Sequence, residues 1–141
     1  MKSNMAKKCF LIPLLLSLVA FVGCGGHVGL TGKVIFSDDG TPVPLGTVAL
    51  ESDTSFSRAG IQPDGTFTVG SLKKADGLPP GLYRVYITGA EMLVGQDSNG
   101  NDIYVQLIDP KFTRPETSGL TIDISHTTRD FVIEVDRFVR K

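Results

Sequence analysis

Apolar and polar residues alternate with a period of two along much of the chain from residue 30 onward. Seven such runs are separated by turn residues, and the apolar positions are Leu30, Val34 and Phe36; Val48 and Leu50; Phe67 and Val69; Tyr83, Val85 and Ile87; Ile103, Val105 and Leu107; Ile122 and Ile124; and Phe131, Ile133 and Val135. No window sustains the 3.6-residue apolar repeat of an amphipathic helix. The pattern predicts seven short β-strands, each with one face turned to a core.

The spacing of these runs predicts how the strands pair. The connections leave no room for crossover helices, so we expect the strands to pair largely antiparallel. Inward-facing alternation on seven short strands is best buried between two packed sheets. The prolines after residue 40 all fall between the runs, as a sheet requires. Residues 30–141 are therefore predicted to form one all-β, seven-stranded antiparallel sandwich.

The N-terminal segment has a different composition. Lys2, Lys7 and Lys8 precede a largely apolar run, Phe10–Val22, which is followed by small residues. A basic start, a short apolar stretch and small residues at its end are the layout of a secretory signal. A membrane-spanning helix is the alternative, but crossing the hydrocarbon takes about 20 apolar residues and this run is shorter. Residues 1–23 are predicted to be a signal peptide.

The end of this segment adds an anchor to the prediction. Phe21-Val22-Gly23-Cys24 resembles the lipobox of bacterial lipoproteins, with Phe21 where that family usually has Leu. The resemblance implies cleavage before Cys24, attachment of diacylglycerol to its thiol, and a mature domain held by lipid on the outer side of a membrane in the bacterial cell envelope. Stable anchoring takes two or more acyl chains.

Removing the signal changes the charge and leaves a short tether. Without Lys2, Lys7 and Lys8, 11 of the 14 basic residues remain against 15 acidic ones, a net charge of −4. This acidic balance excludes the basic footprint of a nucleic-acid-binding protein. Residues 24–29 join the lipid to the domain, and their five flexible residues after Cys24 reach about 12 Å. The domain is expected to lie close to the membrane.

Four motifs in order carry a second resemblance. They are Gly32-Lys33-Val34, Gly40-Thr41-Pro42-Val43-Pro44-Leu45-Gly46, Asp64-Gly65-Thr66-Phe67, and Pro80-Gly81-Leu82-Tyr83. This order is similar to the carboxypeptidase regulatory-like domain, which implies a transthyretin-like (prealbumin-like) Greek-key sandwich. The similarity is close over residues 30–88 and extends to 103–136 only as a strand pattern. Asp64-Gly65 is expected to supply a turn with positive φ.

The candidate chemistry is sparse. The transthyretin-like fold includes the 5-hydroxyisourate hydrolases, which end in Tyr-Arg-Gly-Ser, whereas this chain ends in Phe138-Val139-Arg140-Lys141. His27 and His126 are the histidines, and nothing in the sequence brings them to a nucleophile. Residues 97–102 (DSNGND) resemble the start of a calcium loop, but Gly at the sixth and Glu at the twelfth position are missing. We expect a polar turn there, no metal and no cofactor.

Two segments are longer than a minimal sandwich needs, residues 89–102 and 109–120. Long loops are often functional. If a partner site lies in the second segment, Lys111, Phe112 and Arg114 are its predicted anchors, since an aromatic beside an Arg is common at interfaces. The alternative is that Met92–Val94 extends a strand and Phe112 caps the core. The sequence thus predicts a non-catalytic envelope lipoprotein whose sandwich is a membrane-proximal structural module or an interaction module for an envelope protein. Binding of a polysaccharide or peptide is the second hypothesis, and hydrolysis is the third.

Overall fold

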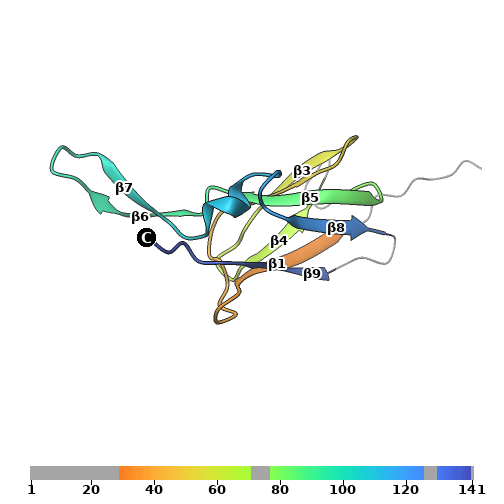
Figure 1. Cartoon of the computed structure of the whole chain (residues 1–141), viewed down its shortest axis with the longest axis horizontal. Coiled ribbons are helices and arrows are strands. Elements are labelled where there is room, and N and C mark those ends of the chain that lie inside the picture. The colour runs from red at the N-terminus through yellow and green to blue at the C-terminus, as the bar shows by residue number, and fades with distance from the viewer. Residues whose placement is uncertain (1–28, 71–76, 126–129, 141) are drawn as a thin grey trace, which may run out of the picture.

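The strands form two packed sheets and a separate hairpin in the computed structural model, which describes residues 29–70, 77–125 and 130–140 (Figure 1). The three-stranded sheet has the order β4 (Thr66–Val69), β1 (Leu30–Phe36), β9 (Asp130–Val135). The four-stranded sheet has the order β3 (Phe56–Gly60), β2 (Thr47–Glu51), β5 (Gly81–Thr88), β8 (Leu120–Ile124). The hairpin consists of β6 (Glu91–Gln96) and β7 (Asp102–Gln106).

The prediction of an all-β, seven-stranded sandwich is confirmed, but one of the predicted strands lies outside it. Ile103 and Val105 were expected to face the core, and both are exposed on β7. The seventh strand of the sandwich is instead β3, which the sequence analysis did not predict. This strand buries only Ser57 and Ala59, while Phe56 is exposed. Because its inward positions carry small side chains, β3 has no apolar alternation to reveal it.

The pairing is antiparallel except between β1 and β9, which run parallel. The expectation of largely antiparallel pairing is confirmed, and the β1–β9 pair is the parallel one among these strands. The chain passes from one sheet to the other between β1 and β2, between β3 and β4, between β4 and β5, and again between β8 and β9. Because the first and last strands are separated by these crossings, no hairpin forces them to run in opposite directions.

The core lies between the two sheets. The predicted inward set of β5, Tyr83, Val85 and Ile87, is buried, and it lies beside the buried Val48 and Leu50 of β2. Burying a side chain of this kind stabilises the fold by about 1.5–3 kcal/mol. The hydroxyl of Tyr83 donates a hydrogen bond to the Pro79 carbonyl at 2.8 Å, so this buried polar atom is satisfied.

Two glycines fit the sandwich for different reasons. Gly65 has a φ of +82°, as the Asp64-Gly65 turn predicts, and its carbonyl accepts a hydrogen bond from the Val34 amide at 2.9 Å. Gly32 has room for nothing larger, because a Cβ there would lie 2.5 Å from the Phe67 ring. Phe67 therefore folds across β1 at the one position where β1 has no side chain.

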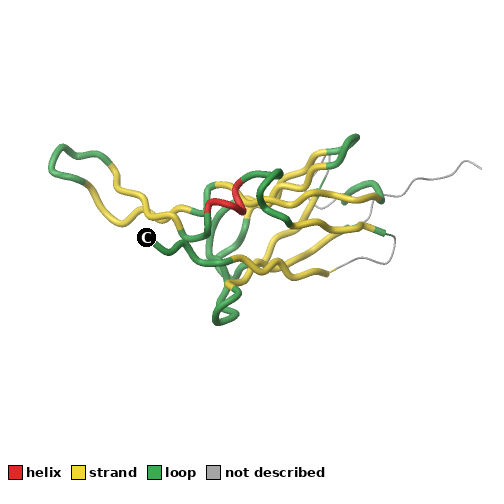
Figure 2. The backbone as a smooth tube through the Cα atoms, in the orientation of Figure 1, coloured by secondary structure: helices red, strands yellow, loops and turns green. Residues whose placement is uncertain are grey.

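Helix is scarce in the described ranges. The 3-10 helix η1 (Pro110–Thr113) is the one helical element there, and it is the red segment of Figure 2. No helix among these residues is long and apolar enough to span a membrane. The predicted signal peptide 1–23, Cys24, His27 and His126 lie outside the described residues.

Candidate functional site

The hairpin projects from one end of the sandwich (Figure 1), and we refer to residues 91–106 as the arm. Glu91, Met92 and Leu93 of β6 pair with Gln106, Val105 and Tyr104 of β7, and a bulge follows between Leu93 and Gly95. Every residue of β6 is exposed, and so is β7 up to its last residue. The arm therefore forms a two-stranded sheet with neither face covered by the described part of the chain.

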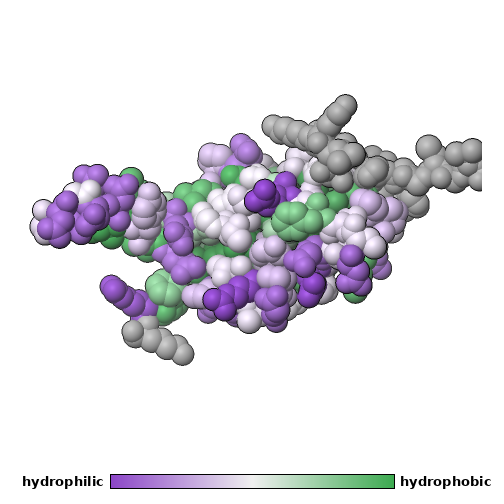
Figure 3. All heavy atoms as spheres, turned by 90° about the horizontal axis from the view of Figure 1, so that it is seen from above, coloured by the Kyte–Doolittle hydropathy of each residue, from purple (hydrophilic) through white to green (hydrophobic). Residues whose placement is uncertain are grey.

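The large apolar side chains of the arm are the main anomaly of the surface. Six of them are exposed by between 41% and 56%, namely Met92, Leu93, Val94, Ile103, Tyr104 and Val105. A single exposed apolar side chain is ordinary, whereas a contiguous group usually marks an interaction site. In Figure 3 the arm stands apart from the body, with hydrophilic atoms over most of the visible face and hydrophobic atoms at its margins.

The two faces of the arm differ in chemistry. Residues alternate between faces along a strand, so Ile103 and Val105 share one face with Met92, the partner of Val105. The opposite face carries Leu93 and Tyr104 between acidic and amide side chains. The Gln96 side chain donates to Asp102 Oδ1 at 2.9 Å on this second face. One face is thus wholly apolar, and the other is an apolar pair with an acidic border.

A polar turn closes the arm, as the sequence predicts for residues 97–102. Asp97 Oδ1 accepts hydrogen bonds from the amides of Asn99 at 2.8 Å and Asn101 at 2.9 Å, and Oδ2 accepts one from the Asn101 side chain. These bonds, the one from the Asn101 side chain first, lower the pKa of Asp97. No group of three His, Cys, Asp or Glu residues in the described ranges is placed to hold a metal ion.

The root of the arm is fixed to the sandwich by buried residues and by the C-terminal segment. Ala90 and Ile108, just outside the arm, are part of the core. The Leu107 amide donates to the Ala90 carbonyl at 2.9 Å, and the Leu107 carbonyl accepts from the Phe138 amide at 3.0 Å. The Asp109 amide donates to the Asp136 carbonyl at 2.9 Å. The arm is therefore held at its base, and beyond it the described part of the chain does not cover it.

The predicted anchors Lys111, Phe112 and Arg114 lie on and beside η1, away from the arm's turn. Phe112 is only 6% exposed and packs in the core, which confirms the alternative that it caps the core. Lys111 Nζ lies 4.7 Å from the centre of the Phe112 ring and pairs with Asp136, an interaction that raises the pKa of Lys111 and lowers that of Asp136. Arg114 is exposed. Their role in partner binding stays a prediction.

A second charged cluster joins the C-terminal segment to the turn after β1. Arg137 pairs with Asp38 and with Asp39, at 2.8 Å in each case, and its guanidinium lies 3.7 Å from the centre of the Phe36 ring. The hydroxyl and amide of Thr41, together with Arg137, hold the pKa of Asp39 at about 2. With every charge paired, this cluster fastens the chain end to the sandwich.

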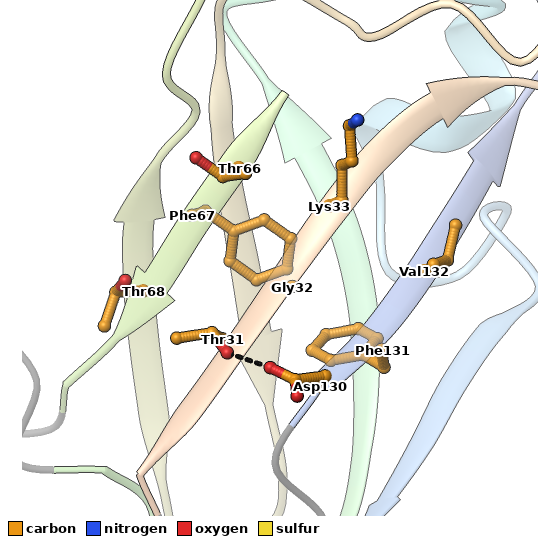
Figure 4. Close-up of a pocket in the computed structure, with 9 residues that line it drawn as sticks. All are labelled: Thr31, Gly32, Lys33, Thr66, Phe67, Thr68, Asp130, Phe131 and Val132. Carbon is orange, nitrogen blue, oxygen red and sulfur yellow. Dashed lines mark hydrogen bonds between the residues drawn. The ribbon is translucent and has the colours of Figure 1, made fainter. Parts of the chain in front are cut away.

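The three-stranded sheet carries a pocket of about 490 Å³ (Figure 4). Three threonines, Lys33, Asp130 and Val132 line it together with Gly32, Phe67 and Phe131; the threonines are Thr31, Thr66 and Thr68. The Thr31 hydroxyl donates to Asp130, and the rings of Phe67 and Phe131 meet edge to face at 5.4 Å. The surface that this lining exposes is mostly apolar, and the threonine hydroxyls, Lys33 and Asp130 add polar groups to it.

Sequence reasoning noticed half of the arm. It singled out residues 89–102 as a long segment in which Met92–Val94 could extend a strand, but assigned Ile103 and Val105 to the core. The signal that could have joined them is the register across the polar turn, which places Met92 opposite Val105 and Leu93 opposite Tyr104.

No family model matches the chain, and no curated protein does. Two solved structures are similar to it. The major pilin subunit of Bacillus cereus is 14% identical with a TM-score of 0.45, over 78% of this chain and 30% of that one. A 9R-lipoxygenase from Cyanothece PCC8801 is 13% identical with a TM-score of 0.41, over 95% of this chain and 19% of that one. This chain thus spans less than a third of either protein.

Proposed function

We propose that this chain is a non-catalytic lipoprotein of the bacterial cell envelope whose β-sandwich serves as a membrane-proximal interaction module. The observation that carries the interaction role is the arm, with six large apolar side chains on a hairpin that packs against nothing in the described ranges. Leaving such a group in water is unfavourable by about 25 cal/mol for each Å² of apolar surface. A partner that covers the arm would remove this cost.

The anchor in this proposal is lipid on Cys24, supported by the lipobox resemblance of residues 21–24 and the signal-like layout before it. Labelling with a radioactive or alkyne-tagged fatty acid, followed by membrane fractionation, tests it. The wild-type chain is expected to be labelled and membrane-bound. The Cys24→Ser variant is expected to lose both the label and signal cleavage; unchanged fractionation of that variant would overturn the anchor.

The domain in this proposal is a carboxypeptidase regulatory-like one. Its support is the order of the four turn motifs, together with a sandwich in which each motif lies at a strand or beside one: Gly32 within β1, residues 40–46 directly before β2, Asp64-Gly65 before β4, and Gly81 at the start of β5. In such a domain the sandwich is a scaffold, and function depends on what projects from it.

Site-specific photocrosslinking in intact cells tests the interaction role. A benzoylphenylalanine is placed at Tyr104 on the arm or, as a matched control, at Leu82 of β5, which is 65% exposed on the sandwich and does not line the pocket. A discrete crosslinked protein at position 104 and none at 82 is the expected result. Equal crosslinking at both positions, or none at 104, would show that the arm is not the interaction surface.

A second candidate function, binding of a polysaccharide or peptide, is favoured by the pocket on the three-stranded sheet. The Thr68 hydroxyl, Lys33 and Asp130 offer hydrogen bonds to a polar ligand, whereas the hydroxyls of Thr31 and Thr66 already donate to Asp130 and Asp64. Retention on envelope polysaccharide that is lost in a Lys33→Ala, Thr68→Ala double variant would support this role over the first.

A further inference from the structure

The charge of the arm restricts what can cover it. Residues 30–141 carry 11 basic and 15 acidic side chains, and the arm alone has Glu91, Asp97 and Asp102 with no Lys or Arg. It therefore supplies −3 of a net −4 on these residues. Two arms facing one another would bring like charges together, and an acidic tip is repelled by anionic lipid head groups. A cationic protein partner is the occupant that this charge favours.

The edges of the arm restrict how the partner is added. In a two-stranded sheet each strand has one edge bonded and one edge open, and an open edge is a template for a further strand. The edge of β6 is interrupted by the bulge between Leu93 and Gly95, whereas β7 is regular over Asp102–Gln106. Just beyond the end of β7, the C-terminal segment already pairs with the chain, because Ile108 forms an antiparallel β-bridge with Arg137. The edge of β7 is therefore the one suited to a new strand.

The side chains beside that edge specify the added strand. A strand on β7 would place alternate residues next to Ile103 and Val105 on one face and next to Asp102 and Tyr104 on the other. Apolar side chains suit the first face. On the second face a Lys or Arg could pair with the Asp102 carboxylate or lie over the Tyr104 ring, both of which are favourable contacts.

On these grounds, which rest on the interaction role proposed above, we propose that the arm binds an extended segment of a partner protein in which apolar and cationic residues alternate. The segment adds to β7 as a third strand of about five residues. This mode of recognition draws affinity from main-chain hydrogen bonds and specificity from alternate side chains.

Fluorescence anisotropy with defined peptides tests the inference on the full-length chain in nonionic detergent. The probe is labelled acetyl-Val-Lys-Val-Lys-Val-amide. One control peptide has Glu in place of Lys, and the other has Pro in place of the central Val, which removes a main-chain donor. The Lys peptide is expected to bind, and each control peptide to bind at least about tenfold more weakly. Binding of all three alike, or of none, would overturn the inference.

Variants of the chain locate the site. Asp102→Asn and Tyr104→Ala are each expected to weaken binding of the Lys peptide about two- to fivefold, the size of one cross-strand charge pair or cation–π contact. Glu134→Gln, which removes one exposed acidic charge from β9 of the sandwich, is the matched control and is expected to bind like the wild type. A loss in Glu134→Gln equal to that in Asp102→Asn would indicate general charge attraction and overturn the site.

Two other occupants appear as distinct outcomes. Sedimentation of a dimer that is lost on Tyr104→Ala would mean that a second copy covers the arm. Binding to vesicles of phosphatidylcholine with phosphatidylglycerol that is lost on the same substitution would mean that lipid does. Either result overturns the inference. Crosslinking of a protein at position 104 without binding of the Lys peptide would leave the proposed function standing and refute only the partner's chemistry.

Discussion

The sandwich and the arm are both built from strands with alternating apolar residues, and they differ in what covers those residues. Tyr83, Val85 and Ile87 of β5 are buried, whereas Ile103 and Val105 of β7 are exposed. β5 has β2 and β8 on its two sides and a second sheet over its inner face, whereas β7 has only β6 beside it among the described residues. A period of two thus predicts a strand and its faces, but whether a face is buried depends on the neighbours that the topology supplies.

The largest difference between the sandwich and the arm is expected in how much stability each loses when a leucine side chain is shortened to alanine. Leu50→Ala in the core should lower the free energy of unfolding by about 2–5 kcal/mol, because it leaves a cavity between the sheets. Leu93→Ala makes the same change on the arm and should alter it by no more than about 0.5 kcal/mol. Urea unfolding of both variants measures this, and equal losses would show that the arm packs as tightly as the core.

Adding a methyl group sharpens the comparison within the sandwich. Gly32→Ala would place a Cβ 2.5 Å from Phe67 Cζ and 2.9 Å from the Phe131 carbonyl oxygen, so it should destabilise the fold by about 1–3 kcal/mol. Gly60→Ala on β3 is the control, because a Cβ there meets nothing within 4 Å. A melting temperature that is lower for Gly60→Ala than for Gly32→Ala would contradict the close approach of Phe67 to Gly32.

Two similar turns, one in the arm and one in the sandwich, test whether the two regions unfold separately. Asp97 in the arm and Asp64 before β4 both accept hydrogen bonds from the amide two residues onward. Asp97→Ala should speed amide hydrogen exchange in β6 and β7 without changing the melting temperature, because an isolated hairpin is marginally stable and separate from the core. Asp64→Ala should lower the melting temperature. A fall in melting temperature with Asp97→Ala would mean that arm and sandwich unfold together.

The smallest expected effect concerns the contact between the sandwich and the C-terminal segment. The pKa of Asp39 is lowered from an ordinary value of 3.8 to about 2 by Thr41 and Arg137. A lowered pKa contributes stability that is present above pH 3.8 and is lost as the pH falls toward 2. Asp39→Asn should therefore reduce the drop in melting temperature between pH 4 and pH 2. An unchanged drop would show that this carboxylate does not couple to folding.

The contrast between the sandwich and the arm also explains which features of the fold the sequence predicts. The inward residues of β5 and the positive φ of Gly65 are predicted correctly, because each is set by local chemistry. The strand β3 was missed, because Ser57 and Ala59 fill its inward positions. The arm was split between loop and core, because its exposure depends on which strands the fold places beside it, and the described residues place none beyond β6 and β7. Cys24 stays a prediction.

The parallel pairing of β1 and β9 has a mechanical consequence. β1 begins at the end of the sandwich away from the arm, and β9 ends toward the arm's root (Figure 1). Tension applied between Leu30 and Val135 would pull these two strands along their length in opposite directions. All the register pairs from Thr31–Asp130 to Phe36–Val135 would then bear load together in shear instead of separating one by one. A pull between the start of β1 and the C-terminal segment would therefore be resisted by the whole length of the β1–β9 ladder.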